Sequence, residues 1–269
     1  GLVRGCSCRG TAGFAHVSCL AEQAKILVEE AVENNLDTKV KQARWERWSI
    51  CSLCEQQYHG VVYCALGWAC WKTYVGRPET DTPRRLAMGV LGGGLYKAGH
   101  HQDALTVREA ELSMMRRLGA SEQNILIVQS NLASTYHSLG HTTEGLRMHT
   151  EVYSGSVQLY GEEHRETIRE ASNYATSLIH LRRFEEAKSL LRKTLPVARR
   201  VLTDSNEITL KIRWSLANSL HDSPSATLDD FREAVTTLED VGRIARRVLG
   251  PSHPLVEMND LRLRNARAT

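Results

Sequence analysis

The chain has 269 residues, with 34 lysines and arginines against 31 aspartates and glutamates, a net charge of +3. This near balance excludes the strongly basic footprint typical of nucleic-acid-binding proteins, and the length suits about two domains. The most apolar stretch, residues 61–71, has only 11 residues, whereas a membrane-spanning helix needs about 20. We therefore expect neither nucleic acid nor a membrane as a partner.

Six cysteine and histidine side chains form three close pairs near the N-terminus. The pairs are Cys6-x-Cys8, His16-x2-Cys19 and Cys51-x2-Cys54. Zinc prefers thiolate and imidazole ligands in a closed tetrahedron, and close pairs separated by loops suit it. The first two pairs are too tightly spaced for disulfide bonds within each pair, and a histidine has no role in a disulfide framework. The pattern predicts zinc, and four thiolates on one ion leave no open position, so the metal should be structural.

The runs Cys6–Leu20 and Cys51–Tyr58 resemble the RING-CH (variant RING) zinc finger. That family binds two zinc ions in a cross-brace through C-x2-C, C-x-C, H-x2-C and C-x2-C. The last three pairs match, but the first has no counterpart because the chain begins at Gly1, so we expect a finger that is incomplete at its N-terminus. The resemblance implies a complete structural Zn²⁺ site formed by Cys6, Cys8, Cys51 and Cys54, with His16 and Cys19 as half of a second site.

Three further side chains are alternatives for completing the half site formed by His16 and Cys19. They are His59, Cys64 and Cys70. Their spacing fits no known ligand pattern. An isolated cysteine is usually a small buried apolar residue, and this is our preferred interpretation of Cys64 and Cys70.

The segments between the cysteine pairs and the second half of the chain predict helices. Apolar residues between Leu20 and Val32 recur with helical spacing. Trp45 and Trp48 come just before the last cysteine pair, where we expect them to cover the metal site. Residues 61–71 predict a short helix between finger and repeats, and the composition of residues 76–83 marks a boundary.

A repeat occupies the remainder of the chain. The motif Ser130-Asn-Leu-Ala133-x2-Tyr136 has counterparts at residues 172–178 and 214–220, a period of 42 residues, with a weaker copy upstream. A fixed period with helical spacing inside it predicts an array of stacked helix pairs. The pattern resembles tetratricopeptide (TPR) repeats in the longer form found in kinesin light chains, over about residues 84–269.

These patterns predict a mainly α protein, with a small zinc-stabilised RING-like module followed by an α-solenoid of about four antiparallel helix pairs. The expected domains are a RING-CH-type finger (1–60), a connecting helix and linker (61–83) and a TPR domain (84–269), with repeats at 84–124, 125–166, 167–208 and 209–269. Gly92, Gly93 and Gly94 make the first repeat the weakest, so we expect it to be frayed or tightly packed. Helix starts are expected at Thr82-Pro83, Asp204-x2-Glu207 and Ser252-x-Pro254.

The TPR resemblance implies a concave groove that binds a protein segment. The matching positions are Asn131, His137, Arg169, Asn173, Lys211 and Asn218. An asparagine side chain can both donate to and accept from a peptide backbone, and Arg169 and Lys211 favour acidic ligands. The alternative is that Asn131 and Asn173 only bond within the helix stack.

No phosphate-binding loop, HExxH or GxSxG motif is present, so we identify no covalent catalytic residue. Two functions remain. In the first, the protein resembles a ubiquitin ligase: the finger recruits a ubiquitin-conjugating enzyme, with Leu53 in the docking surface, and the repeats hold a substrate. The second is a non-catalytic zinc-finger and TPR scaffold for protein–protein interaction. Thiols arranged as metal ligands favour a reducing compartment, so we expect a soluble protein of the cytoplasm or nucleus.

Overall fold

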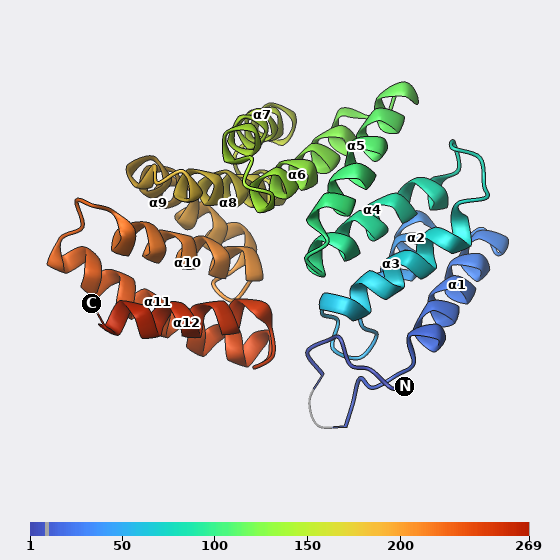
Figure 1. Cartoon of the computed structure of the whole chain (residues 1–269), viewed down its shortest axis with the longest axis horizontal. Helices are drawn as coiled ribbons and strands as arrows, with labels where there is room; N and C mark the ends of the chain where they lie inside the picture. Colours follow the sequence, from blue (N-terminus) through green and yellow to red (C-terminus); the bar gives the residue numbers. More distant parts are fainter. Residues whose placement is uncertain (9–10, 269) are drawn as a thin grey trace. The chain divides into compact units, whose positions relative to one another are not determined.

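The computed structural model describes residues 1–8 and 11–268, and these are mainly helical (Figure 1). The elements are α1 (Val17–Glu33), α2 (Thr38–Trp45), η1 (Glu46–Trp48), α3 (Gly60–Tyr74), α4 (Thr82–Lys97), α5 (His101–Arg117), α6 (Glu122–Ser138), α7 (Thr142–Tyr160), α8 (Arg165–His180), α9 (Phe184–Leu202), α10 (Glu207–Asp222), α11 (Leu228–Val248) and α12 (Pro254–Ala268). The chain divides into two compact units, Gly1–Asn131 and Leu132–Thr269, and α6 crosses the boundary between them.

The first unit is built around an aromatic core beneath the cysteine loops. Trp48 and Tyr74 are completely buried, and Trp45 lies beside them, with ring centroids of Trp45 and Tyr74 5.5 Å apart. Cys6 and Cys51 belong to the same cluster of buried side chains. The two tryptophans expected to cover the metal site therefore share one core with two of its cysteines.

Helices α3 and α4 pack closely because glycines line their contact. A Cβ atom on Gly94 would lie 2.8 Å from the carbonyl oxygen of Tyr63 and 2.9 Å from Cα of Cys64, and a Cβ on Gly67 would lie 3.1 Å from Cα of Leu91. Without these side chains, the two backbones approach each other directly. We expected the first repeat, which contains Gly92, Gly93 and Gly94, to be frayed or tightly packed. In the structure these glycines lie inside one continuous helix and pack tightly. The partner of α4 is α3, which is 15 residues long.

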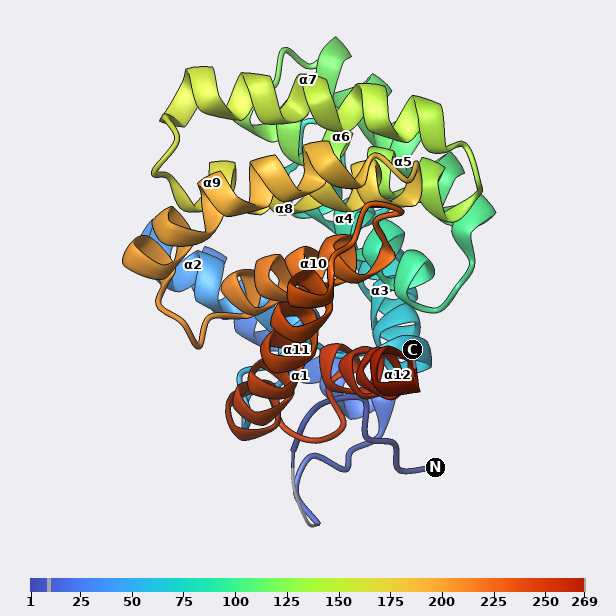
Figure 2. The ribbon, with the colours of Figure 1, turned by 90° about the vertical axis from the view of Figure 1, so that its left-hand side faces the viewer.

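The second unit consists of helix pairs that bury alternating apolar faces. Helices α8 and α9 contact each other, α10 packs against both and against α11, and α12 covers α11 (Figures 1 and 2). Leu191 of α9, Ile212 of α10 and Leu238 of α11 are completely buried in one cluster. The expected arrangement of stacked helix pairs is confirmed.

Two of the three expected helix starts differ in detail. The N-cap of α4 is Asp81, which accepts a hydrogen bond from the Arg84 backbone N–H at 3.0 Å, so the helix begins one residue early. Asn206 caps α10. Asp204, expected to begin a capping box there, instead accepts a hydrogen bond from Arg199 at 2.8 Å. The last helix begins at Pro254 as expected.

The RING-like part of the fold class stays a prediction. Around the cysteines, the described residues form two isolated β-bridges, Val3 with Ala15 and Ile50 with Gln57, and no longer strand. Among residues 1–8 and 11–268, none of the helices combines the length and the apolar character that a bilayer crossing requires.

Candidate metal centre and repeat groove

Four cysteines converge beside the core of the first unit. The sulfur atoms of Cys6, Cys8, Cys51 and Cys54 all lie within 4.8 Å of one another, and those of Cys8 and Cys51 are 3.7 Å apart. Two sulfur atoms bound to one tetrahedral zinc, with Zn–S bonds of about 2.3 Å, lie about 3.8 Å apart. A disulfide would require about 2.05 Å, and all four thiols are free. The donor set fits a tetrahedral thiolate site.

Local geometry makes the sulfur atoms unequal. Burial raises the pKa of Cys51, but backbone N–H groups of Cys54 and Leu53 donate to its sulfur and lower the pKa to about 7. The Leu53 N–H lies 3.5 Å from that sulfur. Burial and hydrogen bonds with neighbouring thiols raise the pKa of Cys8 well above its usual value. Four crowded thiols resist ionising together, and a divalent cation relieves this repulsion.

Two residues of this site were not identified from the sequence. Gly13 has φ +80°, and a Cβ atom there would lie 2.6 Å from Cβ of Cys8 and 2.9 Å from the sulfur of Cys6. Tyr58 is buried, and its hydroxyl forms a hydrogen bond with Cys51. The sequence signals that could have identified them are the glycine between two ligand pairs, which leaves room beside the cysteines, and the tyrosine shortly after the last pair, which bonds to Cys51.

His16 and Cys19 lie together on the surface of the first unit. Both side chains are exposed, and the Cys19 sulfur is 4.0 Å from Nδ1 of His16. Among the described residues, the four-cysteine group is the only set of three or more candidate ligands whose donor atoms converge. His59, Cys64 and Cys70 therefore do not complete the pair in this structure. Cys70 is completely buried in the apolar core, as we expected for a structural cysteine.

The six predicted groove residues are distributed over both units. Asn131 is exposed at the end of the first unit, and its carbonyl oxygen accepts a hydrogen bond from the Arg108 guanidinium. The other five lie in the second unit on α6, α8 and α10. The 42-residue period makes Ser215, not Asn218, the counterpart of Asn131 and Asn173.

Within the second unit, intrahelical contacts occupy three of the groove side chains. Arg169 pairs with Glu166 at 2.6 Å and with Glu170 at 3.0 Å, and Lys211 pairs with Glu207 at 2.6 Å. The Asn173 side-chain amide donates to Glu170 at 3.1 Å. Both cations are thus neutralised by neighbouring carboxylates, which weakens the expected preference for acidic ligands.

Asn218 differs from these residues. It is only 6% exposed, and its side-chain oxygen is buried without a hydrogen-bond partner. A buried carbonyl oxygen without a partner is costly, and a bound water is the partner that such a buried acceptor usually takes.

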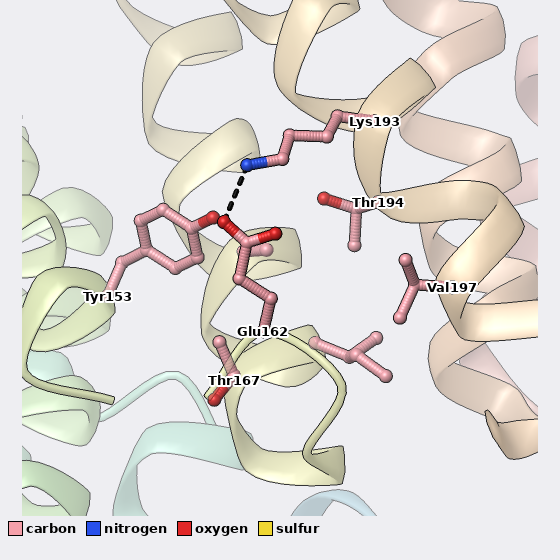
Figure 3. A pocket seen from close by; sticks show the side chains of 8 residues that line it. Tyr153, Glu162, Thr167, Lys193, Thr194 and Val197 are labelled. Carbon is pink, nitrogen blue, oxygen red and sulfur yellow. Dashed lines mark hydrogen bonds and ion pairs between the residues drawn. The ribbon is translucent and has the colours of Figure 1, made fainter. Parts of the chain in front are cut away.

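A small pocket lies between α7, α8 and α9 (Figure 3). It encloses about 260 Å³, part of it open to solvent, and Lys193 and Glu162 form a 2.6 Å ion pair at its edge. Thr167, Thr194 and Val197 also line it. A ligand pocket usually presents several convergent polar groups. Here the charged groups pair with each other and part of the space is open solvent, so the pocket offers little to a small molecule.

Comparison with known families supports the repeats. Residues 124–200 match the model of the tetratricopeptide repeat. The chain is 23% identical over 154 residues to a clustered mitochondria protein homolog of Candida albicans, a match covering 57% of this chain and 11% of the relative. A homolog from Aspergillus fumigatus is 25% identical over 145 residues, covering 54% and 11%. The chain therefore spans about a tenth of the length of the curated relatives it matches.

A solved structure shares the fold. The nearly identical TPR-like repeats of a kinesin light chain from Podosopora anserina superpose with a TM-score of 0.51 at 17% identity, covering 87% of this chain and 97% of that one. At this identity the likeness shows the fold alone. The expected TPR repeats resembling kinesin light chains are confirmed.

Proposed function

We propose that this protein binds a segment of a partner protein through its TPR helices and carries a structural zinc ion in the four-cysteine site. The observation that supports binding is the match of residues 124–200 to tetratricopeptide repeats, together with the helix pairs that form them. Such arrays present the first helix of each pair to extended or helical peptides.

In this proposal Asn173 and Asn218 of the second unit contact the peptide backbone, and Arg169 and Lys211 of the same unit contribute to this face. An asparagine can accept from a backbone N–H while donating to a backbone carbonyl. Because Arg169 and Lys211 are already paired, recognition should depend on backbone hydrogen bonds more than on charge.

Selection from a library of random 12-residue peptides, followed by fluorescence anisotropy on the selected peptides, tests this proposal. Substituting Asn218→Ala and Asn173→Ala together should weaken binding at least tenfold. The matched control is Arg192→Ala, an exposed residue on α9, which should bind as the unchanged protein does. Equal affinity of the double variant would assign both asparagines to the helix stack.

In the four-cysteine site, Cys6, Cys8, Cys51 and Cys54 would hold Zn²⁺, and the ion would supply folding energy to the cysteine loops rather than chemistry. His16 and Cys19 would provide two of the four ligands of a second ion. Zinc would neutralise the crowded thiolates and hold the segments that carry the four cysteines beside the buried core of the first unit.

A finer form of the proposal is a ubiquitin-ligase-like role, in which the cysteine loops dock a ubiquitin-conjugating enzyme. Leu53 lies between two cysteines and is 67% exposed, which suits an apolar docking contact. Discharge of ubiquitin from a panel of charged conjugating enzymes tests this role, with Leu53→Ala against the control Leu86→Ala. Discharge that is absent, or equally fast in both variants, would favour the non-catalytic scaffold.

A further inference from the structure

A second group of possible metal ligands lies in the unit formed by residues 132–269. His137 of α6, His149 of α7 and His180 of α8 bring three imidazoles together from three different helices. The ring centroids of His137 and His149 are 5.8 Å apart, and those of His137 and His180 are 5.6 Å apart. His149 is 2% exposed, whereas His180 lies at the surface.

In the next two helix pairs, a core leucine occupies the position of His149, whereas the upstream copy has the buried Arg108 there. The two leucines are Leu191 and Leu238, which are both completely buried. An imidazole needs hydrogen bonds that a leucine does not. The Nε2 atom of His149 lies 3.5 Å from the Ser134 hydroxyl, and its Nδ1 atom is buried without a partner. The buried Nδ1 atom of His149 therefore offers a lone pair or an N–H group that no neighbouring side chain uses.

The neighbouring backbone is shaped to admit His137. A Cβ atom on Gly145 would lie 2.6 Å from Cδ2 of His137 and 2.8 Å from its Nε2. The corresponding position in the next pair is Ala187, so the ring fits only because this repeat has glycine. Both ring nitrogens of His137 are buried and without a hydrogen-bond partner. Two of the three imidazoles thus hold free nitrogens inside the unit.

We propose that His137, His149 and His180 form a binding site for a divalent transition-metal ion of the zinc class. A nitrogen about 2.0–2.1 Å from zinc places the ring centroid about 3.2 Å from the ion, so two imidazoles on one ion have centroids about 5–6 Å apart. The separations of His137 from His149 and from His180 fall in this range. Of the described residues, only the four-cysteine group already has converged donor atoms, so the rings must rotate about χ2 to direct three nitrogens at one ion.

The chemistry of the cluster also suits a metal. Burial, and the neighbouring imidazoles, lower the pKa of His137 to about 4 and that of His149 to about 3. Both rings are therefore neutral at pH 7, which is the form that binds metal. Three nitrogen ligands leave an open position for water or for a fourth ligand from outside the unit.

Calorimetric titration of Zn²⁺ into the zinc-loaded full chain tests this site. Cys19→Ser is used as the background, so that the exposed pair with His16 does not compete. We expect one additional zinc equivalent, with affinity at least tenfold lower in His180→Ala, an exposed position whose loss should not disturb folding. His100→Ala removes an exposed histidine outside the cluster and is the matched control.

Co²⁺ titration provides a second readout, because nitrogen ligands give d–d bands without the thiolate charge-transfer absorption of the cysteine site. His137→Gln should abolish these bands. No additional equivalent in the Cys19→Ser background, or unchanged affinity in both His180→Ala and His137→Gln, would overturn the proposal and leave the three histidines as packing residues.

Discussion

Thr203 occupies a backbone conformation that the preceding repeat gives to glycine. It ends α9 with φ 78° and ψ 161°, almost the values of Gly161 at the end of α7, φ 81° and ψ 168°. Gly119 and Gly250 follow α5 and α11 with φ 64° and 91°. This region is essentially restricted to glycine, and a β-branched side chain is strained there. Thr203→Gly should therefore stabilise the second unit.

The expected gain follows from two opposing terms. Relief of the strained backbone contributes about 1–3 kcal/mol, and the greater freedom of glycine in the unfolded chain costs about 0.5–1 kcal/mol. The Thr203 hydroxyl contacts only the Ser205 hydroxyl at 3.4 Å in an exposed loop, so its removal adds little. The net stabilisation is about 0–2.5 kcal/mol, with a middle value of about 1, which raises the urea midpoint by about 0.5 M, and by about 1.2 M at most, for an m-value of about 2 kcal/mol/M.

Urea unfolding followed by circular dichroism measures this shift, with Gly161→Thr as the reverse substitution. A Cβ atom on Gly161 meets no atom within 4 Å, so a loss of stability in that variant is attributed to backbone strain rather than to a clash of the added Cβ. Thr203→Gly should raise the midpoint and Gly161→Thr should lower it. A lowered midpoint for Thr203→Gly, or a neutral Gly161→Thr, would refute the strain argument.

Two further predictions concern the metal centre and pH. Gly13→Ala should weaken zinc binding at least tenfold in a competition titration, whereas Gly76→Ala, whose added Cβ meets no atom within 4 Å, should not; equal affinities would contradict this. Because the pKa of His149 is about 3 when folded and 6.5 when unfolded, only the unfolded chain binds this proton. The contribution of His149 to the free energy of unfolding is therefore fully present above pH 6.5. It is lost as the pH falls toward 3, by up to about 1.4 kcal/mol per pH unit. The slope should shrink in His149→Leu.

The helix pairs were predictable because the same small and apolar residues recur at the positions where helices pack against each other. Small and apolar residues at fixed offsets, such as Ala133, Ala175 and Ala217, are all completely buried where helices meet. In a stacked array each repeat packs against its neighbours in the same way, so a fixed period in the sequence becomes a fixed spacing of helix pairs in the structure. The cysteine set was predictable for a similar reason, since Cys6, Cys8, Cys51 and Cys54 have no other common role.

What the sequence did not reveal depends on which side chains become neighbours in the folded protein. The glycines of α4 looked destabilising, and their function appears only when α3 lies against them. Arg169 and Lys211 looked like free cations, but Glu166 and Glu207, one turn away, neutralise them. The three histidines stand apart in sequence, and only the packing of α6, α7 and α8 brings their rings together.

The most direct test of the account is the zinc content of the protein purified without chelator. The converged sulfur atoms of the first unit predict about one tightly bound zinc per chain by elemental analysis after removal of weakly held metal. Cys54→Ser should lose this zinc and the fold of the cysteine loops, while the helices of the second unit, with their own buried core, keep their circular dichroism. Protein that is free of zinc, or that keeps its zinc in Cys54→Ser, would contradict the account.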